Sequence, residues 1–202
     1  MIVAVESNFV LELTFRQEEA IECERIMELA SSGGVQLVIP ACSLFEPFET
    51  LARRRIQRDQ ILNALNRELR ELARTQAYAG LAETSKSVTR ALAESGELHA
   101  AALESVMWKI AGLSTVIPLT GETMRKALGY QLVYPLSAQD NIVLASIDDY
   151  FSSENGAHKV FANKNRKDFS SPVVEGHLRQ YRCRVIGSFA DTRRYIEHAI
   201  SA

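Results

Sequence analysis

The strongest constraint on the fold is an alternation of two strand-like segments and one helical segment within the first 40 residues. Residues 2–5 and 35–40 are short apolar runs rich in β-branched side chains, which is typical of strands covered by helices on both faces. Between them, residues 9–30 place apolar side chains at helical spacing among glutamates, up to the Ser-Ser-Gly-Gly at 31–34. We therefore predict one helix over 9–30 and a βαβ unit with a right-handed crossover.

The rest of the chain predicts an α/β domain that contains a long helical segment. Residues 41–111 have a helical pattern almost throughout, with weak breaks near Gly80 and at Ser95-Gly96. A length of 202 residues suits one domain, or one domain with an insertion. Three further strands are predicted at 115–119, 159–162 and 183–186, and three further helices at about 121–128, at 138–151 and at the C-terminal end.

Composition excludes several classes of protein. Hydrophobic residues make up 47% of the chain and charged residues 24%, which is unlike collagen, disordered proteins or disulfide scaffolds. Three widely spaced cysteines without a CxxC pair predict neither a disulfide framework nor a cysteine zinc site, and favour a reducing compartment. No apolar run approaches the roughly 18–20 residues that a membrane span needs. We expect a cytoplasmic protein that does not enter a membrane.

Acidic residues follow several of the predicted strands. Glu6 comes directly after the first strand, and Glu46 follows the second by a few residues. Asp140 lies in the first turn of the helix at 138–151, behind the predicted N-cap Ser137, and Asp168 follows the strand at 159–162. Ligands of parallel α/β sheets gather at the carboxyl ends of the strands, and converging carboxylates would suit a hard divalent cation. Taken singly, each acid also has an ordinary structural explanation, such as a favourable charge at a helix N-terminus.

Four segments in register resemble the PIN-domain family of nucleases. They are Ile-Val-Ala-Val-Glu-Ser-Asn at 2–8, Val-Ile-Pro at 38–40 followed by Glu46, the stretch 134–146 around Asp140, and the stretch 160–169 that ends in Asp-Phe. In that family a strand ends in Asp-x-Asn, a Glu follows the second strand, a helix opens with Asp before an apolar run, and a late strand leads into an acidic segment. The resemblance covers about 1–48 and 114–190.

The resemblance implies a fold, an activity and a set of site residues. The fold would be a three-layer α/β/α arrangement around a central parallel sheet of about five strands, a single domain over 1–202 with a helical insertion at about 50–112. The activity would be that of a metal-dependent endoribonuclease that uses Mg²⁺ or Mn²⁺ to cleave phosphodiester bonds. The metal ligands would be Glu6, Glu46 and Asp140, with Asp168 as a fourth catalytic acid and Asn8 and Asn165 in support.

Two departures from the family pattern keep an alternative open. Glu6 stands where the family usually has Asp, and its extra methylene moves the carboxylate outward. The fourth acidic region is Asn-Lys-Asn-Arg-Lys-Asp, so that its acid depends on the alignment. The alternative is a catalytically weakened PIN-like module that binds nucleic acid or another protein. Glu46 and Asp140 in register favour the enzyme.

The net charge of −2 conceals two opposed regions. Residues 1–49 carry nine acidic and two basic side chains, whereas residues 159–194 carry nine basic and three acidic ones. Basic side chains give salt-dependent affinity for phosphate, although they are equally common on solvated helix faces. As partners we expect RNA, single-stranded in preference to duplex, an inhibitory protein as in toxin–antitoxin pairs, or a second copy of the chain. The residues predicted to contact nucleic acid are Lys164, Arg166, Lys167, Arg53 and Arg54.

Overall fold

The computed structural model describes residues 1–78, 80, 85–164 and 169–201. The chain forms two compact units: Met1–Pro47 with Ser105–Ala202, and Phe48–Glu104. The first is called the α/β unit below and the second the helical unit. The helical unit begins at Phe48 and overlaps most of the range of about 50–112 where the sequence predicts an insertion. Among the described helices, none is both long and apolar enough to cross a membrane.

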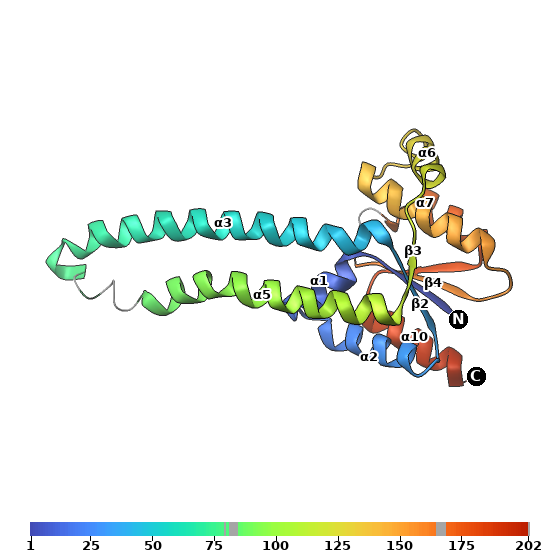
Figure 1. Ribbon diagram of the computed structural model, residues 1–202, viewed down its shortest axis with the longest axis horizontal. Coiled ribbons are helices and arrows are strands. Elements are labelled where there is room, and N and C mark those ends of the chain that lie inside the picture. The colour runs from blue at the N-terminus through green and yellow to red at the C-terminus, as the bar shows by residue number, and fades with distance from the viewer. Residues whose placement is uncertain (79, 81–84, 165–168, 202) are drawn as a thin grey trace. The chain divides into compact units, whose positions relative to one another are not determined.

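The α/β unit is built on a parallel sheet with the strand order β3-β2-β1-β4-β5 (Figure 1). All four residues of the central strand β1 are buried, which explains its unbroken apolar sequence. The prediction of a parallel sheet of about five strands is confirmed. The strands are β1 (Ile2–Val5), β2 (Gln36–Pro40), β3 (Thr115–Ile117), β4 (Lys159–Ala162) and β5 (Cys183–Ile186).

Helices cover both faces of this sheet. On one face Ile2 and Ala4 pack with α7 and α9 in a core that includes Leu144 and Phe151. On the other, α1, α2 and α10 pack together. The layers are therefore α/β/α, as predicted. The described helices are α1 (Ser7–Phe15), α2 (Ala20–Ser31), α3 (Ala41–Ala73), the 3₁₀ turn η1 (Gln76–Tyr78), α5 (Lys86–Leu113), α6 (Gly121–Tyr130), α7 (Ala138–Ser153), α9 (Pro172–Arg179) and α10 (Phe189–Ser201).

Two details of the predicted helices are wrong. The single helix over 9–30 is two helices, because the chain turns at Arg16, whose φ of 47° is left-handed. The side chain of Glu12 supports this turn by accepting a 2.9 Å hydrogen bond from the Glu19 amide. The break at Ser95-Gly96 is absent from α5, where the Ser95 hydroxyl donates to the Leu92 carbonyl inside the helix and the glycine is tolerated.

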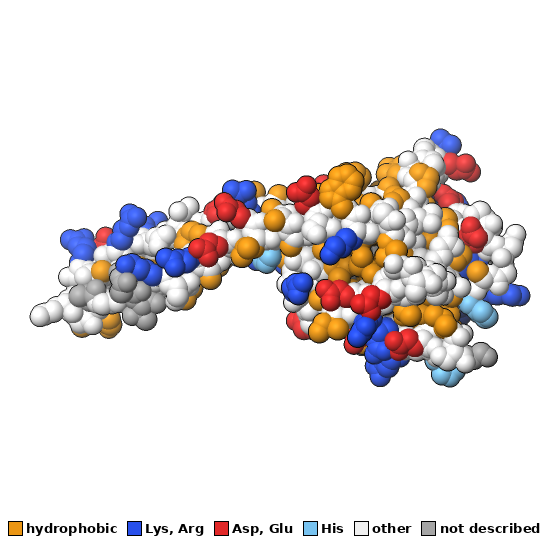
Figure 2. Space-filling view, turned by 60° about the horizontal axis from the view of Figure 1, so that its bottom comes forward, with side chains coloured by type: hydrophobic (Ala, Val, Ile, Leu, Met, Phe, Trp, Pro, Cys, Tyr) orange, Lys and Arg blue, Asp and Glu red, His pale blue; other side chains and the backbone are white. Residues whose placement is uncertain are grey.

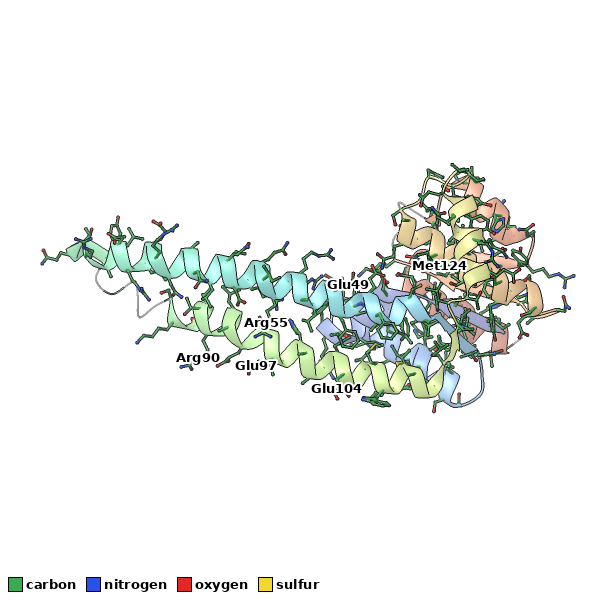
Figure 3. All side chains as sticks on the ribbon, turned by 45° about the horizontal axis from the view of Figure 1, so that its top comes forward. Glu49, Arg55, Arg90, Glu97, Glu104 and Met124 are labelled. Atoms are coloured by element: carbon green, nitrogen blue, oxygen red, sulfur yellow. The ribbon has the colours of Figure 1, made fainter. Side chains whose placement is uncertain are left out.

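In the helical unit, stretches of α3 and α5 run antiparallel and side by side (Figures 1 and 3). The less exposed positions recur every three or four residues on each helix, as expected where two helices face each other. Few side chains are buried, and among the described residues 48–104 they are Thr50, Leu69 and Leu103. Basic side chains gather over this unit on the face shown in Figure 2.

Candidate functional site

Glu6 occupies the junction at which β1 passes directly into α1. Its backbone is extended, with φ −134° and ψ −169°, and it is the N-cap residue of the helix that begins at Ser7. The residue is only 6% exposed. The Ser7 hydroxyl donates a 2.5 Å hydrogen bond to Oε2, whereas Oε1 accepts none from the residues that the structure describes. A carboxylate that a strand end would normally leave in solvent is thus held inside the α/β unit.

Burial gives this carboxyl group an unusual acidity. Removal from water raises the pKa of Glu6 to about 7, and the negative charge of Glu46 adds to the rise, although polar groups of Ser7 and Asn8 oppose it. The structure therefore brings Glu6 and Glu46 close enough to interact. Glu46 is half-buried on α3, just beyond the end of β2. Two carboxylates this close repel each other, so a proton or a cation that neutralises part of their charge stabilises the pair.

Asp140 lies in the first turn of α7. The hydroxyl of Ser137 accepts a 3.1 Å hydrogen bond from the Asp140 amide and donates one of 2.6 Å to its Oδ2. The predicted N-cap is therefore confirmed, and it also orients the Asp140 carboxylate. The neighbouring Asn141 is fully buried, with its Nδ2 donating to the Leu136 carbonyl.

Three buried oxygen atoms near these acids make no hydrogen bond within the described part of the chain. They are Oε1 of Glu6, Oγ of Ser43 and Oδ1 of Asn141. Each lies in one of the three segments that carry Glu6, Glu46 and Asp140. Buried polar atoms nearly always have a partner, whether protein, water or ion. These oxygens are hard donors of the kind that Mg²⁺ and Mn²⁺ bind, so the donor chemistry at the ends of β1 and β2 fits such a cation.

The acids do not form a complete metal cluster on their own. Among residues 1–78, 80, 85–164 and 169–201, no group of three or more His, Cys, Asp or Glu side chains is arranged to hold a metal ion. Glu6 and Glu46 interact electrostatically, and within the described residues no third such side chain joins them in a metal-binding group. The other predicted residues of the fourth region, namely Asn165, Arg166, Lys167 and Asp168, lie outside the described residues.

Lys164 and Asn8 line a pocket of about 330 Å³ that also includes two acids, Glu12 and Glu18. Lys164 Nζ donates to Glu12 Oε1 at 2.5 Å and to Glu18 Oε2 at 3.2 Å. Glu12 is 2% exposed and was missed by sequence reasoning. The available signal was an acid alone in the apolar run Phe9-Val10-Leu11-Glu12-Leu13. Of the other predicted phosphate contacts, Arg53 and Arg54 lie on α3 in the helical unit.

Comparison with known families decides the classification. A model described as a PIN domain matches residues 3–169. The chain belongs to the PIN domain family. PIN domains are generally nucleases and typically depend on a metal ion. The matched range of this PIN domain includes the helical unit as well as Glu6, Glu46 and Asp140. Neither the curated proteins nor the solved structures gave a match.

Proposed function

We propose that this PIN domain is a metal-dependent endoribonuclease whose cation is held by Glu6 and Glu46, with Asp140 completing the acidic edge. The observation that carries the proposal is the buried Glu6 carboxylate, which has an unpartnered Oε1 among the described residues and the charge of Glu46 nearby. Isolating such a carboxylate from water is unfavourable unless something neutralises it. A divalent cation would do so.

The chain's own residues have distinct roles in this proposal. Ser7 holds Oε2 of Glu6, and Ser137 holds the Asp140 carboxylate at the N-terminus of α7, an end of a helix that favours anions. When bound, Mg²⁺ or Mn²⁺ would acidify a water molecule and stabilise charge on the phosphate. Asp168 would be the fourth acid, with Asn8 and Asn165 in support, and Lys164, Arg166, Lys167, Arg53 and Arg54 would contact phosphates. We propose single-stranded RNA as the substrate, a cytoplasmic location, and regulation by an inhibitory protein or by self-association.

A weakened module that binds nucleic acid or protein is the second candidate. Glu6 replaces the usual Asp, and the described acids do not form a three-residue cluster. Both features reduce the number of ligands available to one ion. This candidate predicts binding of RNA without cleavage.

Cleavage of a labelled single-stranded RNA with and without Mn²⁺ or Mg²⁺ separates the two candidates. Because both carboxylates would hold or position the ion that acts on the reacting phosphate, Asp140→Asn and Glu46→Gln should each lower the cleavage rate by more than about 100-fold. Glu68→Gln is the matched control, because Glu68 is an exposed acid on the same helix as Glu46. Equal cleavage by all four proteins that persists in EDTA would exclude the nuclease proposal. Binding without cleavage by the unaltered protein would favour the weakened module.

A further inference from the structure

A cluster of basic side chains lies between the two helices of the helical unit. Arg58 Nη1 on α3 donates to Oγ of Ser95 on α5 at 2.9 Å and lies 3.1 Å from Nδ1 of His99. A guanidinium can only donate, so Nδ1 of His99 must accept, and the ring proton is on Nε2. Arg54, one helical turn before Arg58, is likewise half-buried. These four residues are called the arginine seam below.

The arginine seam occupies positions at which a helix pair normally places apolar side chains. Further along α3, the same face continues with Leu62, Leu65 and Leu69, at successive intervals of four, three and four residues beyond Arg58. A packed pair of helices gains its stability from apolar side chains at such positions, and a charged residue there lowers it. Two arginines one turn apart are therefore unfavourable for the unit by itself.

Like charges in the arginine seam oppose one another. Burial lowers the pKa of Arg54, and the charges of Arg58 and Arg53 lower it further. Burial likewise lowers the pKa of His99, with Arg58 and Arg54 adding to the effect. Each shift disfavours the charged form. The local charge is thus one that an anion would relieve.

Three acidic side chains of the helical unit form ion pairs outside the arginine seam. Within its described residues, Glu68 pairs with Arg67, Glu71 with Arg74, and Glu94 with Arg90. In the described part of the chain no carboxylate lies within ion-pair distance of Arg53, Arg55 or Arg58. Figure 3 labels Arg55 on α3, with Arg90, Glu97 and Glu104 on α5.

We propose that the arginine seam binds a phosphodiester group of an RNA backbone. The guanidinium groups of Arg54 and Arg58 match the geometry of phosphate oxygens. Arg53 and Arg55 flank Arg54 and are exposed, so positive charge continues beyond the seam. That extent suits a polyanion better than a single carboxylate. The identity of the ligand as RNA rests on the proposed function.

Binding of RNA by the full chain tests the arginine seam. Every protein carries Asp140→Asn, and the assay contains EDTA, so that the RNA is not cut. The probe is a fluorescein-labelled oligouridine of about 20 nucleotides, titrated by polarisation at several salt concentrations. Arg58→Gln should weaken binding about 5–10-fold and reduce the slope of log affinity against log salt by about 0.7, the value for one phosphate contact on a single strand. Arg67→Gln, with the same charge change at an exposed site on α3, should weaken it less than about twofold.

Two further measurements keep the test decisive. Arg58→Gln should change the melting temperature little, because the removal of repulsion offsets the loss of its hydrogen bonds to Ser95 and His99. Arg58→Lys should bind RNA with intermediate affinity, because it keeps the charge without the planar fork. Equal weakening by Arg58→Gln and Arg67→Gln would overturn the proposal. The proposal would also be overturned if Arg58→Gln lost binding to poly-glutamate but kept its binding to RNA. That result would indicate an acidic protein partner. Arg58-dependent binding in this assay, together with no metal-stimulated cleavage by the chain that keeps Asp140, would count against the proposed nuclease function alone.

Discussion

Lys164, just beyond β4, donates a hydrogen bond of 2.5 Å to the carboxylate of Glu12 on α1. Glu12 is buried, with a side chain 3% exposed, whereas Lys164 is 37% exposed. Burial alone would lower the pKa of Lys164, but the hydrogen bonds with Glu12 and Glu18 outweigh it and raise the pKa. The lysine thus neutralises an interior charge beside the predicted fourth acidic region.

Removing this lysine should destabilise the α/β unit strongly. Lys164→Met would leave the buried Glu12 without its cation, and because the Lys164 side chain is partly exposed the cost should be about 2–3 kcal/mol, below that of a fully buried pair. Urea unfolding at neutral pH measures the change. Arg25→Met is the control, because Arg25 forms an exposed pair with Glu28 and should cost less than about 1 kcal/mol. Equal losses in the two variants would show that Glu12 does not depend on Lys164.

Asp148 forms a second buried network, which connects α6, α7 and α9. Its carboxylate accepts hydrogen bonds from Lys126 at 2.9 Å and Tyr130 at 2.6 Å, and lies 3.1 Å from Nε2 of His177. Burial raises the pKa of Asp148, but the hydrogen bonds from Tyr130, Tyr181 and Lys126 outweigh it and hold the pKa below its ordinary value. The ionised form is therefore the stabilising one.

The stability contributed by Asp148 should depend on pH. Because its pKa is lower in the folded state than in the unfolded state, the contribution is complete above the unfolded pKa of about 4 and is lost as the pH falls below it. Asp148→Asn should cost about 2–3 kcal/mol at pH 7, and the difference from the unaltered protein should shrink between pH 4 and pH 3. Urea unfolding at several pH values measures this. A difference that stays constant down to pH 3 would contradict the role of ionisation.

Two helix N-caps allow stability to be separated from activity. Ser137 caps α7 and Ser171 caps α9, each accepting a hydrogen bond from a backbone amide. Ser137→Ala and Ser171→Ala should each cost about 1 kcal/mol in thermal unfolding. Only Ser137 also donates a hydrogen bond to Asp140, so only Ser137→Ala should slow RNA cleavage in addition to lowering stability. Equal effects of both variants on cleavage would mean that Ser137 does not position Asp140.

The strands were predictable because each is a short apolar run, and β1, β4 and β5 begin and end where the sequence indicates. The turn at Arg16 could not be predicted, because no Gly or Pro marks it in the sequence. It depends on a hydrogen bond from the Glu19 amide to the Glu12 side chain. Ser95-Gly96 suggested a break in the helix, but α5 continues through both residues.

The candidate site was predictable only in part. The position of Glu6 at a strand end follows from the apolar run before it, but its burial and its closeness to Glu46 depend on how α1 and α3 leave the sheet. The meeting of Arg58 with Ser95 and His99 depends on the register of two antiparallel helices, which no local pattern specifies.

The position of the helical unit in the strand order bears on how this protein can vary in length. β2 and β3 are neighbouring parallel strands, and such a pair needs a crossover connection of only about a dozen residues. Here the crossover spans residues 41–114 and contains the whole helical unit. The crossover begins at the end of β2 and ends at the start of β3. Matched heptads could therefore be added to or removed from α3 and α5 without altering any strand pairing. The strand pairings of the sheet therefore do not fix the length of the helical unit.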